Sequence, residues 1–223
     1  SYANEPAVGF VEVNNENSIL SRWTALADLQ GDHRMALAAM WQDFLAKNGK
    51  SNLDIYKVID QFDTEATPEQ KEMFWEFLVE TELSYAAEMI EFLKNDIGVK
   101  MPVSESQASY SGMAGVYREA KYADFIDMHA YWQHPRWLGR AWDRNNWTIG
   151  NSSMVSDEKS GTLKRFSQHR VKGMPLTISE YDHPAPAFYC AEMYPMMNST
   201  AAFQDWDGIY HFNYSPNSEL GLI

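Results

Sequence analysis

Apolar residues recur along the chain with two different spacings, which predict helices alternating with short strands. Residues 19–47 carry leucines and aromatics three, four and seven positions apart, which predicts a helical region that breaks near its middle. Residues 67–98 show the same spacing behind a Thr-Pro-Glu start, which is typical of a helix N-terminus. Residues 157–170 and 184–203 predict two further helices. Residues 51–64 are polar and only loosely periodic, which indicates an inserted connection.

Five other runs have the length and composition of strands. The first passes from an apolar run directly into a cluster of carboxylates and amides, and the fourth leads to Glu180. Helices that alternate with strands indicate an α/β fold with a parallel sheet, in which functional groups collect at the carboxyl ends of the strands. The five predicted strands are residues 6–18, 99–107, 123–132, 173–184 and 208–214.

The first run ends in side chains that are expensive to bury. Alternation along a strand puts Glu12, Asn14 and Glu16 on one face, and such groups require partners when they leave water. A polar strand end that only caps the next helix is the alternative, because Asn17 and Ser18 are good capping residues. The second strand of the same design, which ends in a glutamate, favours a functional site.

The polar residues at the strand ends form an ordered set. Asn15 and Glu16 end the first strand, His129 and Tyr131 end the third, and Glu180 stands in the sequence Ile-Ser-Glu-Tyr of the fourth. This set resembles the clan A glycoside hydrolases, which are retaining enzymes with a (β/α)8 barrel. In that clan an Asn-Glu pair ending barrel strand four supplies the acid/base, a glutamate ending strand seven is the nucleophile, and strand six often carries a His or Tyr.

The resemblance covers nearly the whole chain and implies an α/β fold, a (β/α)8 TIM barrel of which only about the last five βα units, strands four to eight, are present. We expect a single domain over residues 1–223, with a helical insertion at about 50–96 and a cleft loop at about 132–155. A five-strand piece would expose two sheet edges, which folded proteins avoid. We therefore expect the missing N-terminal half of the barrel as a partner.

The resemblance also assigns roles to individual residues. Glu180 is the expected nucleophile, and Glu16 is the expected general acid and later base of a double displacement at a β-linked glycosidic bond. Asn15 would hold the sugar hydroxyl beside the reacting carbon, and Tyr131 would donate a hydrogen bond to Glu180. The side chains expected to shape the sugar-binding positions are His129, Trp132 and Trp147.

Composition narrows the choice of partners. The 223-residue chain carries 18 basic and 31 acidic residues, for a net charge of −13, so nucleic acid and membrane surfaces are poor partners. Aromatic residues make up 14% of the chain, which suits a carbohydrate substrate, although core packing would absorb most of them. The single cysteine allows neither an internal disulfide nor a cysteine metal site. We expect no cofactor and a secreted or periplasmic protein.

Two other functions remain open at this stage. A carbohydrate-binding barrel or inactive fragment would keep the aromatics without turnover. A metal site could use Glu16, Glu180 and His129, with ligand distances of about 2.0 to 2.2 Å to a bound ion. The distance between the two glutamate carboxyl groups discriminates between the functions, because retaining hydrolysis requires about 5 to 5.5 Å.

Overall fold

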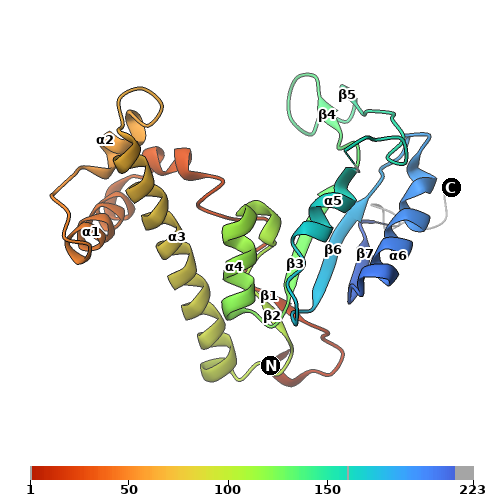
Figure 1. Cartoon of the computed structure of the whole chain (residues 1–223), viewed down its shortest axis with the longest axis horizontal. Helices are drawn as coiled ribbons and strands as arrows, with labels where there is room; N and C mark the ends of the chain where they lie inside the picture. The colour runs from red at the N-terminus through yellow and green to blue at the C-terminus, as the bar shows by residue number, and fades with distance from the viewer. Residues whose placement is uncertain (1, 160, 214–223) are drawn as a thin grey trace.

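The computed structural model describes residues 2–159 and 161–213, and these residues form an α/β structure (Figure 1). Strands β1 (Val11–Glu12) and β2 (Val103–Ser104) pair in parallel. Strands β3 (Ile126–Tyr131), β6 (Leu176–Asp182) and β7 (Gly208–His211) form a second parallel sheet in the order β3-β6-β7. The prediction of an α/β fold with parallel strands is therefore confirmed.

The five predicted strands do not form one continuous sheet in the described part of the chain. Strands β2 and β3 are joined only beside their start, where Asp124 N donates to Val103 O at 2.9 Å and Val103 N donates to Asp124 Oδ2 at 2.7 Å. The two sheets are therefore neighbours rather than one arc, and the partial barrel stays a prediction. Residue 214, at the end of the last predicted strand, lies outside the described residues.

The first strand is much shorter than the sequence predicted. Ala7 is exposed and Phe10 half-buried, and only Val11–Glu12 pair with a neighbour. The expected buried strand is therefore wrong over residues 6–10. The pairing with β2 is limited to two residues, so the apolar run before it has no second strand to pack along.

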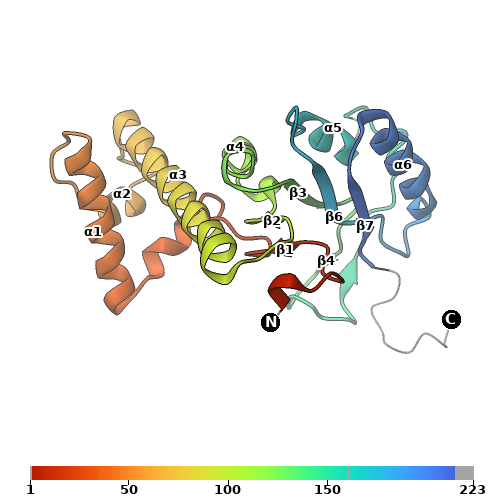
Figure 2. The same cartoon turned by 90° about the horizontal axis from the view of Figure 1, so that it is seen from below.

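Helices α4 (Gly112–Tyr122), α5 (Gly161–Gln168) and α6 (Met193–Gln204) accompany the β3-β6-β7 sheet (Figures 1 and 2). Two 3-10 turns, η4 (Ala108–Tyr110) and η5 (Cys190–Glu192), precede α4 and α6. Helix α6 begins later than predicted, since prolines 184 and 186 hold the preceding segment in turns. The core shared by this sheet and its helices consists of Ala108, Val116, Ile126, Met128, Phe166, Leu176, Ile178, Tyr181, Met193 and Met197.

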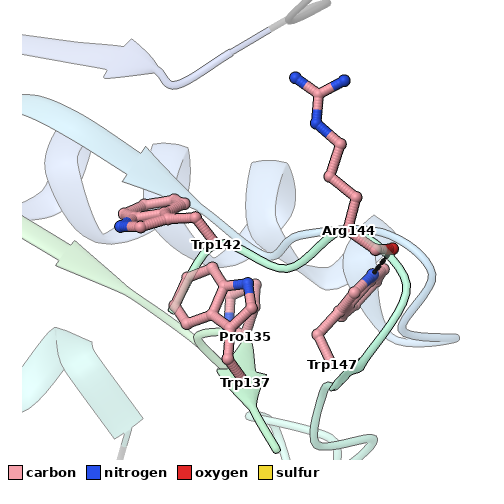
Figure 3. Close-up of a pocket in the computed structure, with 5 residues that line it drawn as sticks. All are labelled: Pro135, Trp137, Trp142, Arg144 and Trp147. Carbon is pink, nitrogen blue, oxygen red and sulfur yellow. Dashed lines mark hydrogen bonds between the residues drawn. The ribbon is translucent and has the colours of Figure 1, made fainter. Parts of the chain in front are cut away.

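The long connection after β3 contains a small antiparallel hairpin. Strand β4 (Arg136–Trp137) pairs with β5 (Trp147–Thr148), and Trp137 lies opposite Trp147. Figure 3 shows the tryptophans of this connection around a pocket. The loop expected at about 132–155 thus contains regular structure of its own.

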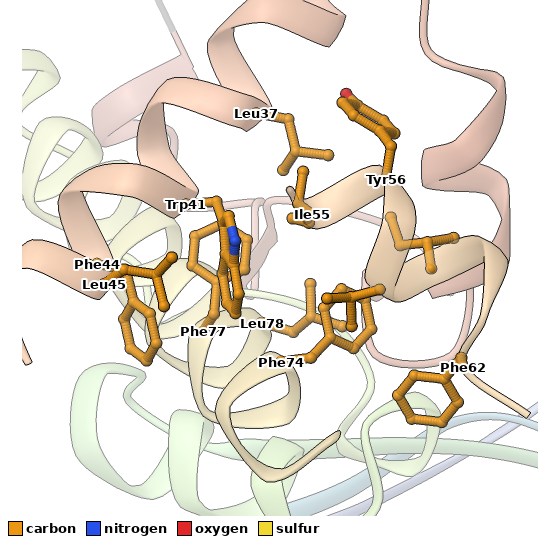
Figure 4. Packing of buried hydrophobic residues seen from close by; sticks show 12 residues of the cluster. Leu37, Trp41, Phe44, Leu45, Ile55, Tyr56, Phe62, Phe74, Phe77 and Leu78 are labelled. Atoms are coloured by element: carbon orange, nitrogen blue, oxygen red, sulfur yellow. The ribbon is translucent and has the colours of Figure 1, made fainter. Parts of the chain in front are cut away.

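The helices of the N-terminal half form a unit with a separate hydrophobic core (Figure 4). They are η2 (Trp23–Asp28), α1 (Gly31–Lys47), α2 (Ile55–Asp60), α3 (Pro68–Glu91) and η3 (Phe92–Ile97). Trp41, Phe74 and Leu78 are completely buried in this core. No helix in the described part of the chain is both long and apolar enough to cross a membrane.

Helix α2 corrects the prediction for residues 51–64, which we expected to be an inserted connection. Asp54 caps the helix by accepting from Tyr56 N at 2.9 Å, and Ile55, Tyr56, Val58 and Ile59 are buried. The sequence did not reveal this short apolar face, because a helix of six residues contains less than two full helical turns in which apolar positions can recur.

Helix α3 connects the helical unit to the first sheet. Thr67 and Gln70 form a capping box at its start. Its 24 residues extend about 36 Å, so that Phe74 lies in the helical core while Ile90 packs with Val99, Met101 and Val103 beside β2. Ala3, the middle residue of η1 (Tyr2–Asn4), also belongs to this third cluster.

A buried arginine ties helices α3 and α4 to the segment after β2. The Arg118 side chain is 1% exposed and forms ion pairs with Glu82, with Glu105 at 2.9 Å and with Glu119 at 2.7 Å. Its guanidinium also donates to the Ser106 carbonyl at 3.2 Å. Three carboxylates face one guanidinium, and burial raises the pKa of Glu119 to about 7 although Arg118 opposes the shift.

We expect the Glu119→Gln variant to change the pH dependence of stability. The folded pKa of about 7 lies above the ordinary value of 4.5, so the folded state holds a proton that the unfolded state loses between these pH values. Wild-type stability therefore falls as pH rises from about 4.5 to 7, and the variant lacks this contribution. In thermal unfolding between pH 5 and 7.5, the melting temperature of the variant minus that of the wild type should increase as the pH rises.

Glu88→Gln, at an exposed position on α3, is the matched control and should keep a constant offset from the wild type. Parallel curves for Glu119→Gln and the wild type would contradict the protonation of Glu119.

Candidate active site

Glu16, His129 and Glu180 meet at the carboxyl ends of the strands. His129 Nδ1 lies 2.9 Å from Glu16 Oε1 and 3.0 Å from Glu180 Oε2. One carboxylate oxygen of each glutamate and one ring nitrogen of the histidine all lie within 4.8 Å of one another. The His129 side chain is 4% exposed, while those of Glu180 and Glu16 are 16% and 32% exposed. The two carboxyl groups are thus open to water and the imidazole between them is not.

A bulge in β6 brings Glu180 to this position. Met128 lies opposite Ile178, but the next residue, His129, lies opposite Glu180, so Ser179 is an extra residue on β6. The register between β6 and β7 shifts at the same place. Because of the extra residue, Ser179 and Glu180 both reach His129, which two consecutive residues of a regular strand would not do.

Asp127 fixes the far side of the histidine ring through Ser179. The Ser179 hydroxyl donates to Asp127 Oδ2, and His129 Nε2 lies 2.8 Å from the same hydroxyl oxygen. Because the Ser179 hydroxyl donates its only proton to Asp127, its oxygen acts as the acceptor toward His129, and Nε2 carries the donated hydrogen. Nδ1 then faces a carboxylate oxygen of Glu16 and one of Glu180.

Each glutamate also faces a tyrosine hydroxyl. Tyr131 OH donates to Glu180 Oε1, and Tyr110 is hydrogen-bonded to Glu16. Burial, together with these bonds to the carboxylates, raises the pKa of both tyrosines. The phenols therefore stay protonated and act as donors.

Gln107 holds the backbone at Glu16. Its Oε1 accepts from Glu16 N at 2.7 Å, and its Nε2 donates to Glu12 and, at 3.2 Å, to Asp127. Burial raises the pKa of Glu12, with the bond from Gln107 opposing the shift. Glu16 has a φ of 50°, a left-handed conformation that costs a non-glycine residue about 1–3 kcal/mol. The turn aims Glu16 at His129 instead of continuing the alternation of the strand.

The other predicted sugar-binding residues make no hydrogen bond to either carboxyl group within the described part of the chain. Asn15 is exposed beside Glu16, and its side chain makes no hydrogen bond within residues 2–159 and 161–213. Trp132 donates to the Ser152 carbonyl at 2.9 Å, and Trp147 donates to the Arg144 carbonyl at 3.1 Å in the hairpin loop. Their part in binding a sugar therefore stays a prediction.

Sequence reasoning omitted several residues that surround the three groups. Asp127 precedes His129 by two positions, so the same alternation that united His129 with Tyr131 could have included it. Ser179 depends on the bulge, and Tyr110 comes from a 3-10 turn in a connection that carries no periodic signal.

The arrangement suits two kinds of chemistry. Two carboxyl groups separated by this distance, one of them able to take a proton, fit an acid and a nucleophile at a glycosidic bond. The same two carboxylates and the His129 nitrogen also offer the ligand types that divalent metals such as Zn²⁺ accept.

Comparison with known proteins found one structural similarity that we report here. The chain aligns over 91% of its length with the hyperthermostable endo-1,4-β-D-mannanase from Thermotoga petrophila RKU-1, in a structure with maltose and glycerol, at 13% sequence identity and a TM-score of 0.43. It covers 62% of that enzyme chain, so it spans less than two thirds of its length. No family model and no curated protein matches the sequence.

We expect Ser179→Ala to move the proton on the His129 ring. Without the serine, Nε2–H loses its acceptor, and the two carboxylates then favour the proton on Nδ1. Nitrogen NMR of the ring should report Nε2–H in the wild-type protein and Nδ1–H in the variant. Ser51→Ala, at an exposed position, should leave the spectrum unchanged. An unaltered tautomer in Ser179→Ala would show that Asp127 does not orient the ring through Ser179.

Proposed function

We propose that this chain carries the catalytic residues of a retaining glycoside hydrolase that cleaves β-linked glycosidic bonds in a polysaccharide or oligosaccharide. The observation that carries the proposal is that a carboxyl oxygen of Glu16 and one of Glu180 lie within 4.8 Å of each other, although 164 residues separate them in the sequence. Retaining enzymes place their carboxyl groups about 5 to 5.5 Å apart, whereas inverting enzymes need about 6.5 to 9.5 Å to admit a water. The separation therefore favours double displacement.

In this mechanism Glu180 attacks the anomeric carbon while Glu16 protonates the leaving oxygen. The bond to the leaving group breaks as a glycosyl ester forms on Glu180, and Glu16 then removes a proton from the water that releases the sugar. The Tyr131 hydroxyl orients Glu180 and stabilises its ionised form. His129 Nδ1 lies 2.9 Å from Glu16 Oε1, so the imidazole is in hydrogen-bonding contact with the proposed general acid.

The remaining expectations belong to the same proposal. Asn15 stands exposed next to Glu16, as a residue that holds the hydroxyl beside the reacting carbon must. A β-linked carbohydrate is the substrate, the N-terminal half of a barrel is the partner, and the protein acts in a secreted or periplasmic setting without a cofactor.

A metal site is the second candidate, favoured by the three ligand atoms of Glu16, His129 and Glu180 within 4.8 Å of one another. Calorimetric titration with Zn²⁺ discriminates between the two. A metal site requires binding that Glu16→Gln and Glu180→Gln abolish, and activity that chelators remove. The hydrolase predicts chelator-resistant cleavage.

Substituting either glutamate should remove activity and keep the fold. On a panel of β-linked polysaccharides, Glu180→Gln should show no detectable cleavage, and Glu16→Gln should lose about 10²- to 10⁴-fold in kcat. Azide should restore turnover to Glu180→Gly, because the small anion replaces the missing nucleophile.

Glu158→Gln, at an exposed position outside the site, should keep full activity. Carbohydrate binding without any cleavage by the wild-type protein would favour a non-catalytic carbohydrate-binding barrel. Full activity in Glu180→Gln would contradict the mechanism.

Tyr131→Phe should lower kcat by about 10- to 100-fold, the loss expected for one hydrogen bond to a charged group. The effect should appear in kcat rather than in KM, since the tyrosine hydroxyl bonds to Glu180. Tyr117→Phe, on an exposed tyrosine of α4, is the matched control. Equal kcat values for Tyr131→Phe and the wild type would show that the donor is not needed.

A further inference from the structure

The hairpin loop after β3 carries a pocket that is separate from the three groups at the strand ends. Its volume is about 380 Å³, and it is lined by Pro135, Trp137, Trp142, Arg144 and Trp147 (Figure 3). The ring centroids of Trp137 and Trp142 are 4.4 Å apart at 48°, and Trp142 is 76% exposed. Three tryptophan side chains gathered around one pocket leave apolar ring surface in contact with water. This contact is unfavourable, and a ligand that covers the rings would remove it.

The charge of the loop is opposite to that of the rest of the chain. Residues 133–150 contain Arg136, Arg140 and Arg144 but only one acidic residue, Asp143, so they carry a charge of 3 − 1 = +2 in a chain of net charge −13. All three arginines are exposed, and among the described residues their guanidinium groups make no ion pair or hydrogen bond. Arg140 and Arg144 also line a neighbouring hollow of about 480 Å³ that includes Trp142.

Aromatic rings connect this pocket to the carboxyl groups. Tyr131, which donates to Glu180, has its ring centroid 5.3 Å from that of His134. The His134 ring lies 6.2 Å from Trp137, which in turn packs on Trp142. These ring contacts form a continuous row of aromatic side chains from Tyr131 to the pocket.

We propose that the pocket formed by Trp137, Trp142 and Trp147 binds an anionic stretch of the glycan, with Arg140 and Arg144 pairing to its carboxylate or sulfate groups. Tryptophan faces stack on the apolar faces of sugar rings, and the planar guanidinium matches the geometry of a carboxylate or sulfate. In Figure 3 the Arg144 side chain extends away from the tryptophan rings, and Arg144 is exposed. This site rests on the proposed hydrolase function and specifies its substrate class.

The charge of the molecule favours a glycan over a nucleic acid here. A nucleic acid carries one charge at every phosphate, and the acidic surface outside the loop repels so dense an anion. A glycan in which neutral sugars separate the acidic ones spaces its charges more widely. At physiological salt, repulsion between charges separated by more than about 8 Å is largely screened, so the arginines determine the local interaction.

The test measures binding without turnover, using the full chain with Glu180→Gln. Calorimetry compares a β-linked oligosaccharide containing uronic acids, the same oligosaccharide with its carboxyl groups reduced to alcohols, and a sulfated analogue. We expect the uronate or the sulfated chain to bind about fivefold or more tightly than the reduced one, with an affinity that falls as salt is added. The tighter of the two anionic ligands identifies the charged group.

Two further substitutions separate stacking from charge. Trp142→Ala should weaken binding of all three oligosaccharides about tenfold, because it removes a stacking face. The double variant Arg140→Gln and Arg144→Gln should weaken only the anionic ligands, to the level of the reduced oligosaccharide. Arg22→Gln, at an exposed position in the helical unit, should leave every affinity unchanged.

Equal affinity for charged and reduced oligosaccharides, or tighter binding of a single-stranded oligonucleotide, would overturn the anionic-glycan site. Cleavage of neutral glycans by the wild-type protein without any acidic preference would contradict this site alone. Binding that follows the expected pattern, with no cleavage of any ligand by the wild-type protein, would instead contradict the hydrolase and keep the site.

Discussion

The candidate site depends on the hydrogen bonds that the carboxylate of Asp127 accepts. It is buried between β3 and β6 and accepts hydrogen bonds from Gln107, Thr177 and both the backbone and the hydroxyl of Ser179. Through Ser179 it stabilises the bulge that turns Glu180 toward the site, and through Gln107 it reaches the backbone of Glu16. One buried carboxyl group is thus connected to both proposed catalytic glutamates, and the four hydrogen bonds that it accepts compensate for its burial.

A second buried charge has a different task. Arg118 joins α3, α4 and the segment after β2 through its ion pairs with Glu82, Glu119 and Glu105. Glu105 also accepts a hydrogen bond of 2.8 Å from the side chain of Asn14, the residue two positions before Glu16. Breaking a buried ion pair on one side leaves an uncompensated charge, so such clusters fix how elements meet more than they add stability. Through α3, the helical unit is therefore coupled to the strand end that carries the proposed general acid.

Sequence reasoning located the polar ends of the strands, because the alternation of apolar and polar residues is a local pattern. It expected Glu16 and Glu180 to meet because functional groups collect at the carboxyl ends of parallel strands and because of the family resemblance. It did not reach the details that bring these groups together. The bulge at Ser179 depends on pairing with β3 and β7, and the left-handed turn at Glu16 depends on Gln107, which is 91 residues away. The length of β1 was overestimated because an apolar run does not reveal how many residues of it will pair with a neighbouring strand. Helix α2 was missed because its apolar face contains only four residues.

The helical unit has an aromatic core of its own, and helix α3 connects this core to the rest of the molecule. Trp41, Phe74 and Phe77 pack among α1, α2 and α3 without drawing on the sheet, whereas Met128 and Ile178 belong to the other core. Because Glu82 of α3 pairs with Arg118, a change of helix length near Glu82 would disturb the buried ion pairs, whereas a substitution among Trp41, Phe74 and Phe77 acts first on the packing of the helical unit.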